Sequence, residues 1–182
     1  MQLRDFSARE EINKIKTHEK RKMDIERKGK IVLPTTEETW KAIEYEFDVK
    51  KIEFGKKINF VKDPFKRMVI FRDIEQAFVL ASLGFSKPAV VLAGGVIEEL
   101  LRLYLDQRGI SPQKPLRKDF NGYIQTCSQN KLLGNGVSDL SDSLREFRNL
   151  VHLSAEETKK HTIKKSTAKG AVSSIFTVTY NF

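Results

Sequence analysis

The chain has 182 residues, enough for one domain with an appended segment and a well-buried core. It holds 33 Lys and Arg against 24 Asp and Glu, a formal net charge of +9, and 40% of its residues are hydrophobic. This composition excludes a wholly disordered chain. The positive charge favours anionic partners without naming one.

Cysteine content and the absence of long apolar segments narrow the class further. Cys127 is the only cysteine, which excludes an internal disulfide and a zinc site that needs two or more cysteines. The N-terminus lacks the apolar stretch of a signal peptide, and the apolar run over residues 89–97 is too short to span a bilayer. We therefore expect a cytoplasmic protein without a membrane partner. On its helix Cys127 shares the inner face with Phe120 and Tyr123, which indicates a buried thiol rather than a nucleophile.

Positive charge is spread along the chain, with +3 in residues 1–57 and +6 in residues 58–182. One dense patch lies in residues 156–170, and its lysines are Lys159, Lys160, Lys164, Lys165 and Lys169. Such a patch fits an RNA-binding surface and a solvated helix face equally well.

Residues 1–62 are expected to form an N-terminal basic arm or extension of mixed structure. Residues 7–30 are mostly charged and have too few apolar positions for a core of their own. Thr35 and Glu38 have the spacing of a capping box, which predicts a short amphipathic helix. The alternating apolar residues between Ile52 and Phe60 predict a small hairpin or an extended pair.

Residues 63–182 are expected to form an all-α, antiparallel bundle of four to five helices. Asp63-Pro64 marks its start, and apolar residues at three- and four-residue spacings predict a first helix over residues 70–85. A second helix, over residues 90–107, is opened by Pro88 at its first position and ended by Gly109. It is apolar on most of its circumference, which predicts the most buried position.

Three shorter helices are expected after a loop at residues 111–115. The first spans about residues 119–133, the second begins after Ser138, and the last spans roughly residues 167–180. Gly94-Gly95 in the second helix of the bundle lacks the sequence pattern of a phosphate loop, so close helix packing explains it better.

The helix after Ser138 carries two neighbouring stripes of side chains. The core stripe consists of Leu140, Leu144, Phe147 and Val151. A second stripe lies roughly 100° away on the helical wheel. It consists of Ser141, Arg145, Arg148 and His152, with Asn149 farther round.

This second stripe suits a reaction at phosphate. Arginine binds phosphate oxygens bidentately, and histidine exchanges a proton near neutral pH. RNA supplies its own nucleophile, the 2′-hydroxyl, so such a site could cleave RNA without metal and would spare DNA. The alternative is structural, because histidine and arginine at a helix C-terminus also stabilise the last carbonyls.

The segment from Leu144 to His152, following a buried helix with the sequence Ile97-Glu98-Glu99-Leu100-Leu101, resembles the HEPN (higher eukaryote and prokaryote nucleotide-binding) superfamily. Its signature is Arg, four to six residues, then His, at the end of a helix in an all-α bundle. Arg145 lies six residues before His152, inside that range. Arg148 lies three residues before it and forms an Arg-polar pair with Asn149, so either arginine could be the motif arginine.

The resemblance implies a homodimer that joins two motif helices into one cleft. It implies a metal-independent endoribonuclease without a cofactor, in a toxin–antitoxin, phage-defence or RNA-processing system, with RNA and an antitoxin or other protein as partners. Members without catalysis act as RNA- or nucleotide-binding or interaction modules. The resemblance also implies a polar residue of the second helix at the cleft, Glu98 with Glu99 as a close rival, although both are spaced to pair with Arg102 instead.

Overall fold

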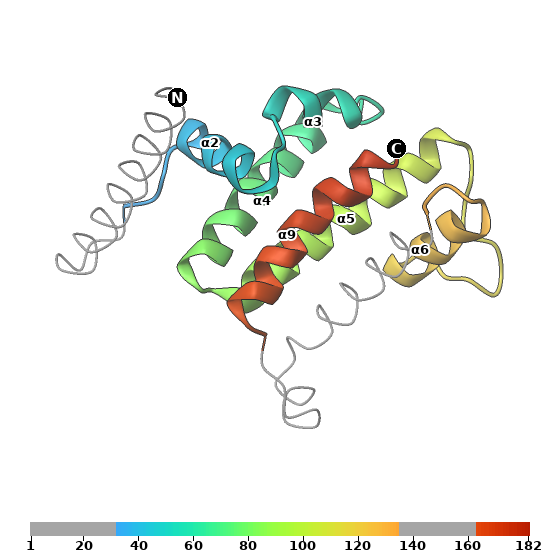
Figure 1. Ribbon diagram of the computed structural model, residues 1–182. Helices are drawn as coiled ribbons and strands as arrows, with labels where there is room; N and C mark the ends of the chain where they lie inside the picture. Colours follow the sequence, from blue (N-terminus) through green and yellow to red (C-terminus); the bar gives the residue numbers. More distant parts are fainter. Residues whose placement is uncertain (1–31, 135–162) are drawn as a thin grey trace, which may run out of the picture. The chain divides into compact units, whose positions relative to one another are not determined.

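The computed structural model describes residues 32–134 and 163–182, and these ranges form six helices and no strand (Figure 1). The helices are α2 (Thr36–Phe47), α3 (Lys51–Lys57), α4 (Pro64–Leu83), α5 (Ser86–Gln107), α6 (Phe120–Gln129) and α9 (Lys165–Tyr180). The predicted all-α class is confirmed for these ranges. The predicted helix after Ser138 lies outside them.

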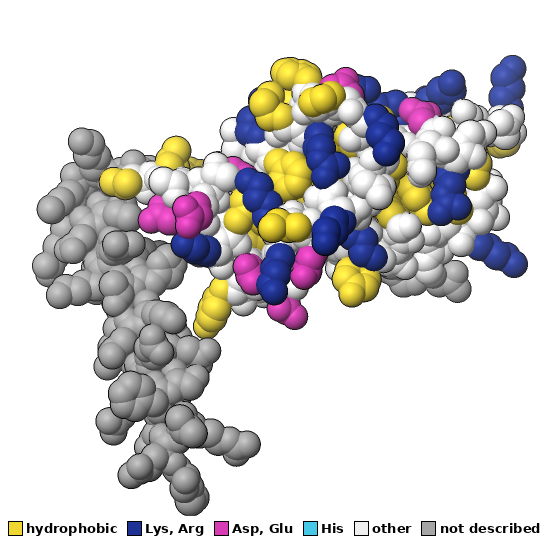
Figure 2. Space-filling view, turned by 90° about the horizontal axis from the view of Figure 1, so that it is seen from above, with side chains coloured by type: hydrophobic (Ala, Val, Ile, Leu, Met, Phe, Trp, Pro, Cys, Tyr) yellow, Lys and Arg dark blue, Asp and Glu magenta, His cyan; other side chains and the backbone are white. Residues whose placement is uncertain are grey.

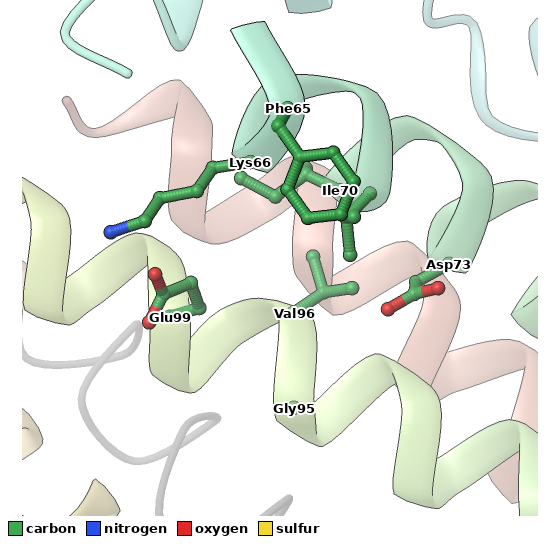
Figure 3. Close-up of a pocket in the computed structure, with 8 residues that line it drawn as sticks. Phe65, Lys66, Ile70, Asp73, Gly95, Val96 and Glu99 are labelled. Atoms are coloured by element: carbon green, nitrogen blue, oxygen red, sulfur yellow. The ribbon is translucent and has the colours of Figure 1, made fainter. Parts of the chain in front are cut away.

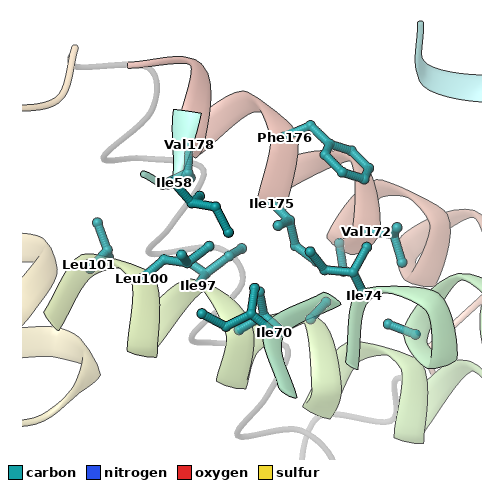
Figure 4. Close-up of a cluster of buried hydrophobic side chains, with 14 of the residues drawn as sticks. Ile58, Ile70, Ile74, Ile97, Leu100, Leu101, Val172, Ile175, Phe176 and Val178 are labelled. Carbon is teal, nitrogen blue, oxygen red and sulfur yellow. The ribbon is translucent and has the colours of Figure 1, made fainter. Parts of the chain in front are cut away.

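α4, α5 and α9 pack against one another and form the centre of the core (Figure 4). The largest of the fully buried side chains there include Ile74 on α4, Ile97 on α5 and Ile175 on α9. α5 has the largest number of buried residues among the described helices, ten of 22, whereas α6 and α9 bury a larger share of their residues, six of ten and eight of 16. Burial of such side chains stabilises the fold by about 1.5–3 kcal/mol each.

The three central helices are not all antiparallel. A two-residue connection, with Gly84 in the left-handed region at φ 88°, turns α4 back into an antiparallel α5. At the start of α9, the Lys165 ammonium donates to the Ser82 carbonyl at 2.6 Å, close to the start of α5. At the other end Phe182 stacks on Tyr104 of α5 with ring centroids 4.3 Å apart. α9 therefore runs parallel to α5 and antiparallel to α4 (Figure 1).

The helix ends follow the predicted capping signals, although α4 begins at Pro64, six residues before the predicted residue 70. The Asp63 carboxylate caps α4 by accepting from the backbone N–H groups of Phe65 and Lys66 at 2.8 and 3.2 Å. α5 begins at Ser86, so Pro88 lies third in the helix, where its missing N–H still costs nothing. α6 ends at Gln129, before the predicted end at residue 133, and Lys131 then has a left-handed φ of 55°.

The prediction of a hairpin between Ile52 and Phe60 is wrong, because most of this segment is the helix α3. Phe54 and Ile58 lie four residues apart and are both buried, so a helical period places them on one inner face. The end of α3 is held by Arg67 of α4, whose guanidinium donates to the carbonyls of Ile58, at 2.8 Å, and Gly55. This cap comes from outside the segment and has no signature within it.

α2 and α3 share the core of the central helices. The capping box of α2 is confirmed, since the Thr35 N–H donates to the Glu38 carboxylate at 3.0 Å and the Glu38 N–H donates to the Thr35 hydroxyl at 3.3 Å. Trp40 of α2 and Phe54 of α3 pack on each other and on Phe176 of α9. The chain divides into compact units at Met1–Pro34 and Thr35–Phe182, so residues 35–62 belong to the same unit as the bundle.

Candidate functional site

Most of the predicted site residues lie outside the described ranges. These are the motif residues Arg145, Arg148, Asn149 and His152 and the patch residues Lys159 and Lys160. Glu98, Glu99, Lys164 and Lys165 are described, so the structure bears on the second helix of the bundle and on the end of the patch.

Glu99 on α5 forms an ion pair with Arg102, which was the structural alternative to a role at the cleft. The Arg102 guanidinium donates to both Glu99 carboxylate oxygens, at 2.7 and 2.6 Å, and its remaining nitrogen reaches Asp106 at 2.7 Å. The hydrogen bond to Glu99 raises the pKa of Arg102. This bidentate partner neutralises the charge of Glu99.

Tyr123 of α6 faces these α5 side chains. Burial raises the pKa of the Tyr123 phenol, while the nearby charge of Arg102 lowers it and that of Glu98 raises it. The phenol therefore keeps its proton at neutral pH and can donate a hydrogen bond. Glu98, Glu99, Arg102, Asp106 and Tyr123, together called the α5 polar strip, form one electrostatically connected group on the described part of the chain.

Two hollows border this strip. One, of about 240 Å³, lies between the end of α5, the following loop and α6. Its polar lining comes from Arg102, Asp106, Ser111, Lys118 and Tyr123. The other, of about 210 Å³, is an apolar groove between α4 and α5. Both are smaller than the 300–1,000 Å³ usual for small-molecule sites.

The α4–α5 groove shows what Gly95 does in this chain. Phe65, Ile70 and Val96 line it, with Lys66 and Glu99 toward one end and Asp73 at the other (Figure 3). A Cβ atom built on Gly95 would have no described atom within 4 Å. Close helix packing, predicted for Gly94-Gly95, is therefore not found at Gly95 among the described residues; instead, Gly95 lines the groove.

Cys127 is a buried thiol, as predicted. Its side chain has no exposed surface, and burial raises its pKa to about 12. A thiol with such a pKa is almost entirely protonated at neutral pH and is a poor nucleophile.

Two further findings concern the described residues only. Within them, no three His, Cys, Asp or Glu side chains gather in a way that could hold a metal ion. No helix in the same ranges has the length and apolarity to cross a membrane.

The described lysines of the predicted RNA-binding patch have structural partners in two of three cases. Lys165 donates to the Ser82 carbonyl, and Lys169 pairs with Glu46 of α2 at 2.7 Å. Lys164 is exposed at the N-cap position of α9, where its side chain forms no cap hydrogen bond. This part of the patch therefore also anchors α9 to its neighbours.

Another basic segment, residues 50–67, was not singled out by its sequence. It contains seven Lys and Arg against two acidic residues, Glu53 and Asp63. The charge counts over residues 1–57 and 58–182 divide this cluster between them, so neither count shows it. A sliding window of about 18 residues would have found it.

Comparison with known proteins adds no relative. No protein-family model matches the chain, and neither a curated protein nor a solved structure was found to match it.

Proposed function

We propose that the protein is a metal-independent endoribonuclease that cleaves RNA through its own 2′-hydroxyl. The observation that carries this proposal is the segment from Arg145 to His152, in which two arginines, Asn149 and a histidine lie beside the apolar stripe of one helical pattern. An all-helical unit with a buried α5 is compatible with the HEPN-like setting of this segment.

The chemistry assigns a role to each side chain. His152 takes the proton of the 2′-hydroxyl, whose oxygen attacks the adjacent phosphorus. Arg145 or Arg148 stabilises the charge on the pentacoordinate phosphorane, and Asn149 orients the phosphate. The bond to the 5′-oxygen breaks, and that oxygen is protonated as it leaves. The products are a 2′,3′-cyclic phosphate and a 5′-hydroxyl.

The proposal extends to the α5 polar strip and to the assembly. Glu98 contributes the polar group of α5 at the cleft, with Glu99, which pairs with Arg102, as the alternative. The active form is a homodimer with two copies of the motif in one cleft. Its setting is the cytoplasm, in a toxin–antitoxin or phage-defence system with an antitoxin or another protein as partner.

A second candidate is a non-catalytic module that binds RNA or nucleotide or a partner protein. The exposed basic segment at residues 50–67 favours it, because phosphate contacts alone give salt-dependent binding without cleavage.

Incubation with mixed RNA in EDTA tests the nuclease. We expect the wild-type chain to produce 2′,3′-cyclic phosphate ends and His152→Ala to lower the rate by about 10²–10³. Arg145→Ala and Arg148→Ala, measured side by side, identify the motif arginine as the one whose loss costs more.

His161→Ala is the matched control, since it removes another histidine from the same part of the sequence. It should cleave like the wild type. Equal rates for the wild type and His152→Ala would refute the catalytic assignment. RNA binding without any cleavage by an intact dimer would establish the second candidate.

A further inference from the structure

The positive charge of the described residues is concentrated in one place. Residues 32–134 and 163–182 together hold 19 Lys and Arg against 13 Asp and Glu. The segment of residues 50–67 holds seven against two, and the rest of the described chain holds twelve against eleven. Almost the whole excess therefore belongs to α3 and its two flanks, called the α3 basic surface below.

This surface is carried by a backbone that the core holds in place. Phe54 and Ile58 anchor α3 from its inner face, and Phe60 and Val61 anchor the turn that follows. The guanidinium of Arg67 on α4 caps the end of α3 through its hydrogen bonds to the carbonyls of Ile58 and Gly55. The lysines are thus presented on a fixed scaffold, which lowers the entropy lost when they bind an extended anion.

Most cations of this surface have no acidic partner in the part of the chain that the structure describes. Within the described residues, Lys50, Lys56 and Lys62 are exposed and have no carboxylate within ion-pairing distance. Of the segment's two acidic residues, Asp63 is committed to the N-cap of α4. Lys51 alone contacts a carboxylate, that of Glu75, at 3.4 Å. Adjacent positive charges without partners repel one another, and a bound polyanion would relieve that repulsion.

Exposed apolar side chains accompany these lysines. Tyr180, at the end of α9, is 76% exposed, and the Lys57 ammonium lies 4.5 Å from the centre of its ring. Phe65, at the start of α4, is 68% exposed. Seen from the side on which α3 lies, Lys and Arg side chains are interspersed with exposed hydrophobic ones (Figure 2). Cations that follow a phosphate backbone next to aromatic rings that stack on bases are the features of single-strand binding.

We propose that the α3 basic surface binds single-stranded RNA, with Lys50, Lys56, Lys57 and Lys62 on phosphates and Tyr180 stacked on a base. The choice of RNA over other single strands rests on the proposed function, whereas the binding surface itself rests on charge and exposure. This surface lies apart in sequence from the lysines at 159–165 and adds a second contact region.

An anionic membrane is a less suitable partner for the same charges. Membrane-surface segments combine basic residues with a broad apolar face that enters the lipid. The apolar face of α3 is buried in the core, and only Ile52 of that helix is an exposed large hydrophobic residue.

The experiment measures the binding of a fluorescent single-stranded RNA of about 16 nucleotides by anisotropy at several salt concentrations. The full chain carries His152→Ala in every variant, so that the RNA persists. The test variant adds Lys56→Gln, Lys57→Gln and Lys62→Gln. The matched control adds Lys114→Gln, Arg117→Gln and Lys131→Gln, three exposed basic residues elsewhere, and has the same net charge.

We expect the test variant to bind about tenfold or more weakly and its salt dependence to fall by about two units, at about 0.7 per lost phosphate contact. The control should bind like its parent. Tyr180→Ala should weaken binding by about fivefold or more, and Tyr180→Phe should not, because stacking needs only the ring.

Equal losses in test variant and control would overturn the proposal, because net charge alone would then explain binding. So would unchanged affinity in the test variant, or binding to phosphatidylserine vesicles without binding to RNA. The nuclease assay separates the two proposals. If binding depends on the α3 basic surface and the wild type does not cleave RNA, this surface stands and the nuclease is refuted. If the wild type cleaves RNA and binding does not depend on the α3 basic surface, the nuclease stands and this surface is refuted.

Discussion

Cys127 shows how one buried side chain links the fold to pH. Burial raises the pKa of its thiol from 9.0 to about 12. Below pH 9 both the folded and the unfolded chain hold the proton. Between about pH 9 and 12 only the unfolded chain releases it, so this residue lowers the free energy of unfolding by about 1.4 kcal/mol per pH unit.

Cys127→Ala should remove that slope. The expected result is that the wild type starts more stable, because the variant leaves a small cavity, and that its advantage shrinks as the pH rises above about 9. Urea unfolding of both chains at several pH values between about 8 and 10.5 measures this. Other titrating groups are common to both chains, so their contributions cancel in the difference between the two free energies of unfolding. Parallel curves would mean that the thiolate forms as easily in the folded chain as in the unfolded one.

At the scale of residues, local pairs were predictable and distant ones were not. The Thr35–Glu38 capping box, the Asp63-Pro64 helix start and the Glu99–Arg102 pair all join residues three positions apart or fewer, so their spacing identifies them. The partners of Glu75 lie 24 to 39 residues away along the chain. Only the packing of helices brings them together.

Glu75 of α4 accepts hydrogen bonds from residues of both α2 and α3. One carboxylate oxygen accepts from the Trp40 indole at 2.6 Å and from Lys51 at 3.4 Å, and the other accepts from the Thr36 hydroxyl at 2.9 Å. Trp40 is 5% exposed, so its indole N–H has little access to water if this acceptor is lost.

Glu75→Ala should therefore lower the free energy of unfolding by about 2 kcal/mol, the usual cost of a buried donor left unsatisfied. Glu75→Gln should cost less, because its amide oxygen can still accept from the indole. Urea unfolding followed by the fluorescence of Trp40, the only tryptophan, measures both. The control is Glu53→Ala on exposed α3 surface, expected within about 0.5 kcal/mol of wild type. A Glu75→Ala chain as stable as that control would contradict this role.

At the scale of elements, long helices were predictable because their apolar residues repeat over several turns. α4, α5 and α9 are such helices. α3 has seven residues, too few for its period to be clear, and Phe54 and Ile58 fit a strand or a helix. Two features settled the choice, the burial of both side chains on one face and the cap from Arg67. Neither is a property of the segment alone.

At the scale of the molecule, the sequence predicted the helical class but not where the unit begins. Asp63-Pro64 begins a helix and predicts the start of the bundle there, while the compact unit starts at Thr35. A helix start and a domain start have the same local signature. The parallel course of α9 and α5 was equally hidden, because it depends on contacts between residues more than 75 positions apart, such as Tyr104 with Phe182.

Shortened chains test whether α2 and α3 are part of the folding unit. The side chains that residues 35–62 bury in the core are Trp40, Ile43, Phe54, Ile58, Phe60 and Val61. Their burial contributes about 10 kcal/mol, which is similar to the whole stability of a typical domain at about 5–15 kcal/mol. A chain that begins at Thr35 should therefore melt cooperatively, and one that begins at Asp63 should not.

Calorimetry and near-ultraviolet circular dichroism of both shortened chains against the full one supply the measurement. The chain from Thr35 should keep a melting temperature within about 4 °C of the full chain, since it retains every helix of the second unit. Loss of α2 and α3 would expose Phe71 of α4 and Phe176 of α9, which pack on Trp40 and Phe54. Cooperative melting of the chain from Asp63 would instead make residues 35–62 an appendage and place the start of the folding unit at α4.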